Sequence, residues 1–278
     1  MQSVAELRAA AQSRIRWELL ANLVRKDLKV KYKNSALGFL WSLANPVLYL
    51  AVFTFVFGVI LPNGVPAFSV YFMSGLLAWN FFNTATLTAT GSVVGNANLV
   101  KKVPFPRIVL PLSSVGFAAV HFALQMGVFA VFLVALHRST FGPQLVLALP
   151  ALAVLLVFTV ALSLVVASLN VIYRDVQHLW EVALLAWFWL NPIVYAMPLV
   201  RAKLEAHGVF WLYMGLNPMA VVIATLQRAI YRSPGPLVDN GYVFYLQWLG
   251  VAGVISLALL GLGVWLFRRF EDNFAEEL

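Results

Sequence analysis

The sequence predicts an all-α integral membrane protein, and three observations lead to this prediction. Hydrophobic residues make up 62% of the 278 residues, and only 11% are charged, whereas a soluble domain carries about 25% charged residues. The charges are grouped, and the stretch from Asn34 to Leu61 contains none. Long apolar segments recur along the chain, and a helix needs about 20 such residues to cross the hydrocarbon core of a bilayer.

We expect a transmembrane domain over residues 36–270 with six spans. The predicted spans are residues 36–61, 67–90, 108–136, 144–171, 179–200 and 242–267. Asn45-Pro46 and Asn191-Pro192 lie inside the first and fifth spans, where membrane helices tolerate a proline kink. The second span carries several Asn and Thr residues, which favour hydrogen bonds between helices.

Residues 1–35 are expected to form an amphipathic helix at the cytoplasmic membrane surface. An apolar stripe with spacings of 3, 4, 4 and 4 is formed by Trp17, Leu20, Val24, Leu28 and Tyr32. Residues 25–33 hold five Lys or Arg and one Asp directly before the first span. This pattern is typical of a helix that lies along a leaflet, and a solvated charged helix is the alternative.

The segment 201–241 differs from the spans because its apolar pieces are short. Val209–Leu216 and Met219–Ile230 are separated by Asn217-Pro218. Neither piece is long enough to cross a bilayer, and such lengths favour re-entrant or interfacial helices.

The distribution of Lys and Arg predicts the orientation. With the N-terminus inside and six spans, 14 of these residues fall on the cytoplasmic side and five on the outer side. Cytoplasmic loops are enriched in Lys and Arg. We therefore expect both termini, including the tail 271–278, in the cytoplasm.

Several functions are disfavoured by what the sequence lacks. There is no Cys, no phosphate-binding loop and no zinc-ligand spacing, so we expect no catalytic residue, no metal and no cofactor in this chain. The basic residues flank apolar runs, where they meet lipid headgroups rather than nucleic acid. The spans contain almost no ionisable residue apart from His121, which we expect to be hydrogen-bonded between helices rather than to relay protons. A transporter without an ion relay or a nucleotide site of its own would take its energy from a separate subunit.

Four stretches are similar, in the same order, to one protein family. They are RKDLKVKYKNSALGFLW (25–41) with Asn45-Pro46; NLVKK (98–102) with Phe105-Pro106-Arg107 and Pro111; Tyr173-Arg174-Asp175 with Phe188-Trp189 and NPIVY (191–195); and the tail FAEEL (274–278). Together they resemble the bacterial polysaccharide-export permeases of the type-2 ABC exporter class. Those permeases move O-antigen, capsular polysaccharide or teichoic acid, and the likeness covers nearly the whole chain.

The resemblance implies an assembly. It would be a homodimer of six-span subunits in the bacterial cytoplasmic membrane, contacting membrane lipids and paired with two cytoplasmic ATPase subunits that hold ATP and Mg. The substrate would be a lipid-linked polysaccharide. The short helices of 201–241 would re-enter from the outer side and gate the exit.

The resemblance also implies a coupling helix in the loop 91–107, at about Asn96–Arg107, that docks into the ATPase. The residues concerned are Asn98, Leu99, Val100, Lys101, Lys102, Phe105 and Arg107. The apolar members would serve as knobs and the basic ones as polar contacts. An ordinary positively charged cytoplasmic loop is the alternative. Arg174 and Asp175 are expected to fix the short cytoplasmic turn between the fourth and fifth spans.

A hydrated sugar chain needs a path lined by hydroxyls, amides and flat rings. Tyr49, Phe53 and Phe57 are spaced four apart in the first span, and Trp187, Asn191 and Tyr195 are spaced the same way in the fifth, so each set shares one helix face. The resemblance implies a channel built largely from these two spans. The alternative is that the rings pack between helices.

Two other functions stay open. One is a type-2 ABC permease for a small lipid or drug. The other is an integral-membrane transferase, for which Arg174, Asp175 and Glu181 are the few charged candidates at the membrane face.

Overall fold

A computed structural model of the chain describes all residues except 1–3, 34–39, 61–67, 104, 137–141 and 232–240. The predicted start and end of the first span, at residues 36 and 61, lie outside the described residues. The first half contains α1 (Val4–Tyr32), α2 (Leu40–Phe55) with the π-helical turn η1 (Val56–Ile60), α3 (Phe68–Thr90), the 3₁₀ turn η2 (Val94–Asn96), α4 (Ala97–Lys102) and α5 (Val109–Leu136). The second half contains the 3₁₀ turn η4 (Pro143–Leu147), α6 (Ala148–Ile172), α7 (Val176–Trp189), α8 (Met197–Glu205), α9 (Phe210–Leu216), α10 (Pro218–Ile230), α11 (Tyr242–Glu271) and α12 (Phe274–Glu277).

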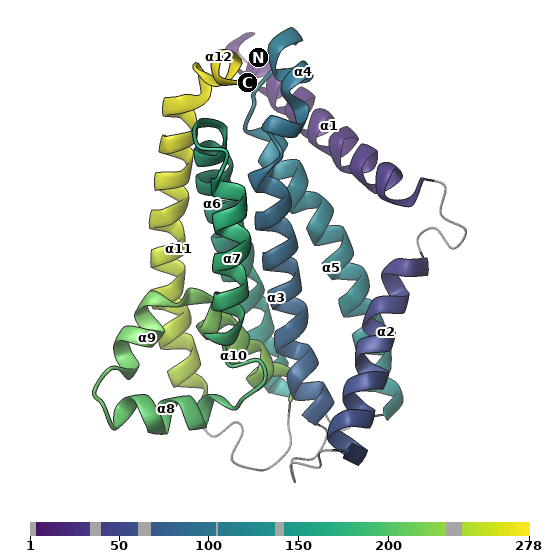
Figure 1. Ribbon diagram of the computed structural model, residues 1–278, viewed down its shortest axis with the longest axis vertical. Coiled ribbons are helices and arrows are strands. Elements are labelled where there is room, and N and C mark those ends of the chain that lie inside the picture. The colour runs from purple at the N-terminus through teal and green to yellow at the C-terminus, as the bar shows by residue number, and fades with distance from the viewer. Residues whose placement is uncertain (1–3, 34–39, 61–67, 104, 137–141, 232–240) are drawn as a thin grey trace.

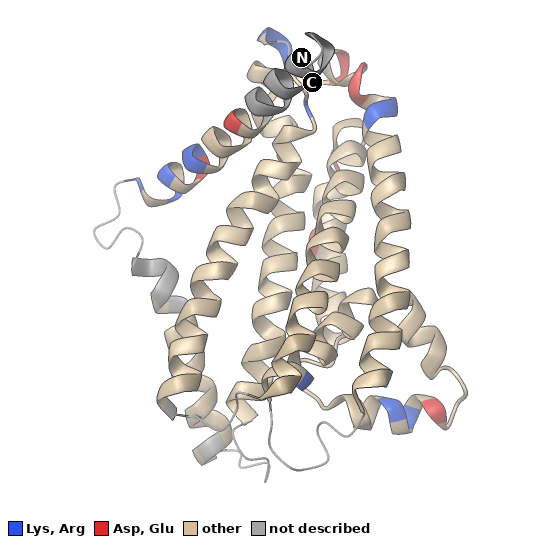
Figure 2. Cartoon of the chain, turned by 180° about the vertical axis from the view of Figure 1, so that it is seen from behind, with Lys and Arg blue, Asp and Glu red and all other residues tan. Residues whose placement is uncertain are grey.

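The helices form an elongated bundle with different ends (Figure 1). We call them the α4 end, where α4, α12 and both chain termini lie, and the α8 end, where α8 and α9 lie. Charged residues gather mainly at these two ends and along α1, and the bundle between them is almost free of charge (Figure 2). This distribution is that of a membrane protein, because a charge in the hydrocarbon layer is costly.

Three helices in the described part of the chain are long and apolar enough to cross a bilayer. They are Val109–Ala135, Pro143–Ile172 and Tyr242–Glu271, and α9 with α10 could make a fourth span bent by 96°. The chain is therefore all-helical in its described parts and a multi-pass membrane protein. The count of six spans stays a prediction.

The central helix is α3, which has 18 of its 23 residues buried and packs against α2, α5, α6, α7 and α10. The expected hydrogen bonds to other helices are wrong for three of its Thr residues. The hydroxyls of Thr86, Thr88 and Thr90 donate to carbonyls one turn earlier in α3, at 2.7 to 2.9 Å, which is a common way for Thr to be satisfied inside a helix. These three hydroxyls therefore donate their hydrogen bonds within α3, and the packing of α3 on its neighbours is mainly apolar.

The contact of α1 with the bundle differs in detail from the predicted stripe. Leu23, outside that stripe, is buried, whereas Trp17 is 68% exposed. At the far end of α1, Lys31 Nζ and Tyr32 Oη lie 3.4 and 3.3 Å from His121 Nε2 of α5. His121 is thus hydrogen-bonded between helices, as predicted. Burial beside α5 lowers the pKa of Lys31.

The fifth helix is shorter than predicted. The predicted span continued to Val200, but α7 ends at Trp189 and α8 begins only at Met197. Pro192 has no N–H to continue the helix, and the chain turns sharply after Leu190. The two short apolar pieces of 201–241 do form separate helices, α9 and α10, and the break falls at Asn217-Pro218 as expected.

The backbones of α11 and α6 approach each other closely at Gly263. A Cβ added at Gly263 would lie 2.8 Å from the carbonyl oxygen of Ala161. A backbone atom cannot move aside as a flexible side chain can, so only glycine fits this position without a shift of the helices.

We expect Gly263→Ala to lower the melting temperature of the purified protein in detergent, because overpacking typically costs about 1–3 kcal/mol. Gly261→Ala is the matched control, since a Cβ there meets nothing within 4 Å. Equal melting temperatures for the two variants would contradict the close approach.

Candidate functional site

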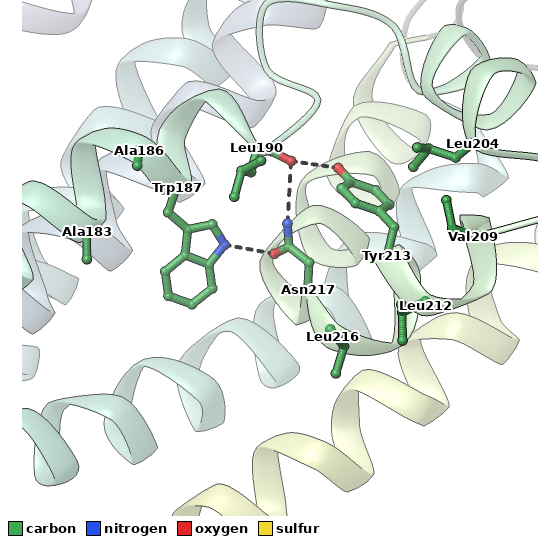
Figure 3. A pocket seen from close by; sticks show the side chains of 10 residues that line it. All are labelled: Ala183, Ala186, Trp187, Leu190, Leu204, Val209, Leu212, Tyr213, Leu216 and Asn217. Carbon is green, nitrogen blue, oxygen red and sulfur yellow. Dashed lines mark hydrogen bonds between the residues drawn. The ribbon is translucent and has the colours of Figure 1, made fainter. Parts of the chain in front are cut away.

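An open cavity of about 660 Å³ lies where α7 ends, and it contains one of the predicted channel residues, Trp187. Its walls come from α7 and from the segment α8–α10 (Figure 3). The lining residues are Ala183, Ala186, Trp187, Leu190, Leu204, Val209, Leu212, Tyr213, Leu216 and Asn217. The wall is mostly apolar, with a small polar group formed by the indole, the phenol and the amide.

Two of these polar groups, the phenol and the amide, meet at the carbonyl of Leu190, the residue that follows α7. The carbonyl oxygen of Leu190 accepts from Tyr213 Oη at 2.8 Å and from Asn217 Nδ2 at 3.5 Å (Figure 3). Carbonyls at a helix C-terminus have no partner in their own helix. Side chains of α9 and of the α9–α10 break therefore donate the hydrogen bonds that the backbone after Leu190 does not supply to this carbonyl.

Asn217 joins three elements. Its Oδ1 accepts from Trp187 Nε1 at 3.0 Å and from the backbone N–H of Ala220 at 3.2 Å, and the second of these bonds caps the start of α10. The ring of Trp187 also makes edge-to-face contacts with Phe82, Phe158 and Trp180, at centroid distances of 5.4, 6.1 and 6.2 Å. Trp187 is thus half-buried between the bundle and the cavity.

The other two residues of the predicted fifth-span face lie beyond the end of α7. Asn191 is 1% exposed, and its Nδ2 donates to the carbonyl of Trp187 at 2.6 Å. Tyr195 donates its hydroxyl to the carbonyl of Trp189 at 2.7 Å and accepts from Tyr71 at its own carbonyl at 3.3 Å. Both side chains hold the turn between α7 and α8 in this subunit.

The first-span face is a stacked row of rings. Tyr49, Phe53 and Phe57 follow one another at centroid distances of 6.2 and 6.0 Å. Phe53 lies 4.1 Å from Phe72 of α3, and Phe57 lies 4.5 Å from Phe68. Tyr49 is 44% exposed. Two of the three rings therefore pack on α3, and Tyr49 faces outward.

The structure does not bring the two predicted faces together within one chain. Both α2 and α7 pack against α3, which lies between them in Figure 1. Both helices expose apolar side chains: Leu48 and Val52 of α2 and Leu185 and Trp189 of α7 are each more than half exposed.

A second cavity, of about 400 Å³, lies between α3 and α7 and was not predicted. Its lining includes Asn80, Asn83, Glu181 and Trp189. The signal in the sequence was the pair of Asn residues three apart, which we interpreted only as helix contacts. Together with Leu87 and Phe188 they give this cavity a mixed polar and aromatic lining.

At the α4 end, the predicted coupling residues fall into two groups. Asn98, Lys101 and Lys102 are exposed. Val100 is buried, and Leu99 and Phe105 pack against the same apolar cluster, which includes Val109 of α5 and Phe267 of α11. The backbone N–H of Arg107 donates to Glu271 Oε1 at 2.9 Å, and its guanidinium donates to the carbonyl of Glu271. The first group is the more exposed of the two, and Val100 is the one predicted coupling residue that is fully buried.

Arg174 and Asp175 are exposed in the turn between α6 and α7. Side-chain contacts across this turn come from Asn170, which the sequence analysis did not select. Its Nδ2 donates to the carbonyl of Thr90 in α3 at 2.9 Å, and its Oδ1 accepts from the N–H of Gln177 in α7 at 3.1 Å.

These features are those of a membrane subunit with a basic helix at one end and short broken helices at the other. The chain belongs to the ABC-2 type transporter family, whose sequence profile matches residues 18–231.

Among its relatives is the O-antigen export system permease protein RfbA of Klebsiella pneumoniae, which is 30% identical over 263 residues, covering 94% of this chain and 95% of the relative. RfbA of Myxococcus xanthus is 29% identical over 261 residues, with coverages of 94% and 95%. The polysialic acid transport protein KpsM of Escherichia coli is 19% identical over 259 residues, with coverages of 90% and 92%.

We expect Asn217→Ala to destabilise the protein by about 1–2 kcal/mol, because it removes a helix cap and the partner of Trp187. Asn217→Ser, which keeps a capping oxygen, should lose less. Trp187→Phe and Asn217→Ala share one hydrogen bond, so their effects on unfolding in detergent should be less than additive in the double variant. Full additivity would show that the indole–amide bond contributes nothing.

Proposed function

We propose that this chain is the permease subunit of an ATP-driven ABC exporter that moves a lipid-linked polysaccharide from the cytoplasm across the bacterial inner membrane. The observation that carries the proposal is the near full-length similarity to permeases named for O-antigen export, which covers 94% of this chain. The chain is a transport subunit, and ATP and Mg bind to a separate ATPase subunit. Type-2 permeases for small lipids or drugs share the family, but the relatives named above are named for glycans.

The proposed topology has six spans with both termini in the cytoplasm. The six are α2 with η1, α3, α5, α6, α7 and α11, and the α4 end faces the cytoplasm. The excess of Lys and Arg on that side supports this orientation. α8 to α10 then lie at the outer side, where the 96° bend between α9 and α10 is suited to a re-entrant pair that gates the exit.

The ATPase docks at the α4 end through the exposed side of α4. Asn98, Lys101 and Lys102 are exposed there. The apolar side of the same helix is packed into the subunit through Val100. The helix is therefore fixed on one side and accessible on the other. In this arrangement a displacement of the ATPase can be transmitted through α4 to the rest of the subunit.

The translocation path lies between two copies of this chain. Within one subunit α3 separates the aromatic face of α2 from α7, so only a second copy can place an α2 beside an α7. The exposed apolar faces of both helices support such an interface. Tyr49 and Trp187 then face the path, and the remaining members of the two predicted sets, Phe53, Phe57, Asn191 and Tyr195, shape the wall behind them.

A strain that lacks this chain should retain lipid-linked polysaccharide inside the cell, and the wild-type chain should restore polysaccharide to the cell surface.

The double variant Lys101→Glu and Lys102→Glu should insert normally but fail to co-purify with its ATPase and fail to restore export. The matched control is Lys203→Glu, an exposed lysine on α8 at the other end. Surface polysaccharide that is unchanged in the deletion strain would contradict the proposed substrate. Full export by the double variant would contradict docking at α4.

A further inference from the structure

The coupling helix α4 is held by the C-terminal end of the chain. Two hydrogen bonds join Arg107, which lies five residues after the end of α4 and two before the start of α5, to the last residue of α11. The N–H of Arg107 donates to Glu271 Oε1 at 2.9 Å, and its guanidinium donates to the carbonyl of Glu271. Hydrogen bonds with a charged partner are about twice as strong as neutral ones, so the start of α5 and the end of α11 are tied at this point.

A second contact lies beyond Glu271. Phe274 of α12 is 1% exposed, and its ring packs edge-to-face on Phe267 of α11 at a centroid distance of 5.2 Å. Both rings belong to an apolar cluster that includes Val100 of α4, which is 4% exposed. α12 packs against α4 and α6, and the three segments are seen together at the α4 end in Figure 1.

The tail has an inner and an outer side. Glu276 and Glu277 are exposed, while Phe274 is almost fully covered and Leu278 packs against the same cluster. An apolar ring buried at the end of a chain stabilises the position of that end, because exposing it again would cost about 1.5–3 kcal/mol. Residues 271–278 are thus a packed part of the α4 end.

We propose that residues 271–278 form a strut that fixes α4 to α11, with Glu271 and Phe274 as its positioning residues. A displacement of α4 by the ATPase is then passed to α11, and from α11 to α6, which packs along it. Without the strut, α4 moves at the end of a loop and the displacement is lost there. This inference rests on the proposed function, in which α4 docks the ATPase.

The test uses the complete complex of this chain with its ATPase in proteoliposomes, with ATP hydrolysis and export measured together. Phe274→Ala and Glu271→Ala should keep hydrolysis but lower the export per ATP severalfold, because a displacement of α4 would no longer reach α11. Phe274→Leu keeps an apolar side chain, and Glu271→Gln keeps the acceptor for the N–H of Arg107. Both should retain most of the export. Unchanged export per ATP in the two alanine variants would overturn the proposal.

A second measurement needs neither export nor the ATPase. The chain has no Cys, so a single Val100→Cys reports whether α4 is covered. In the otherwise unchanged chain this thiol should react slowly with a maleimide, and Phe274→Ala should speed the reaction severalfold. Lys101→Cys, on the exposed side, should react fast in both backgrounds. If Val100→Cys reacts equally with and without Phe274, the strut does not exist.

The two measurements separate the two proposals. A wild-type complex that does not hydrolyse ATP or export glycan refutes the proposed function, and the thiol reaction still decides whether the tail covers α4. If Phe274→Ala does not assemble, the pair Glu271→Ala and Glu271→Gln decides. Equal export per ATP in that pair counts against the strut.

Discussion

The last carbonyls of a helix have no partner within that helix and must find one elsewhere. In this protein that constraint is met at Leu190, where α7 stops before Pro192 and its carbonyl accepts from Tyr213 and Asn217. The same Asn217 caps α10 and holds Trp187. The arrangement of α7, α9 and α10 therefore depends on one group of hydrogen bonds, and the cavity beside them takes its shape from it.

The positions of the helices could be predicted largely from local sequence. The three longest apolar helices coincide with predicted spans, and the break between α9 and α10 falls at the predicted Asn217-Pro218. The end of α7 could not be predicted, although Asn191-Pro192 had been noticed. Membrane helices tolerate proline, so whether the helix bends or stops depends on partners for the freed carbonyls. Those partners are 23 and 27 residues further along the chain.

For the candidate sites too, contacts with distant segments of the chain could not be predicted from local sequence. Spacing placed Tyr49, Phe53 and Phe57 on one face, and they do form one row, but the sequence did not reveal that Phe72 and Phe68 pack against it. In the coupling loop, the residue types suggested contacts to a partner for Val100 and Arg107. Their side chains instead turn towards α11 and α12, because segments 164 residues apart in sequence meet at the α4 end. A six-residue helix has too few turns for its periodicity to show which side is covered.

The contact of Gly263 with the carbonyl of Ala161 also restricts the mechanics of the subunit. At this point no side chain fits between the two backbones, and packed interiors deform little. Because α6 and α11 also pack along much of their length, we expect them to move together, by rotation about a hinge more readily than by shear. The seams free to open are those with larger side chains between the helices, and the aromatic seam between α2 and α3 is of that kind.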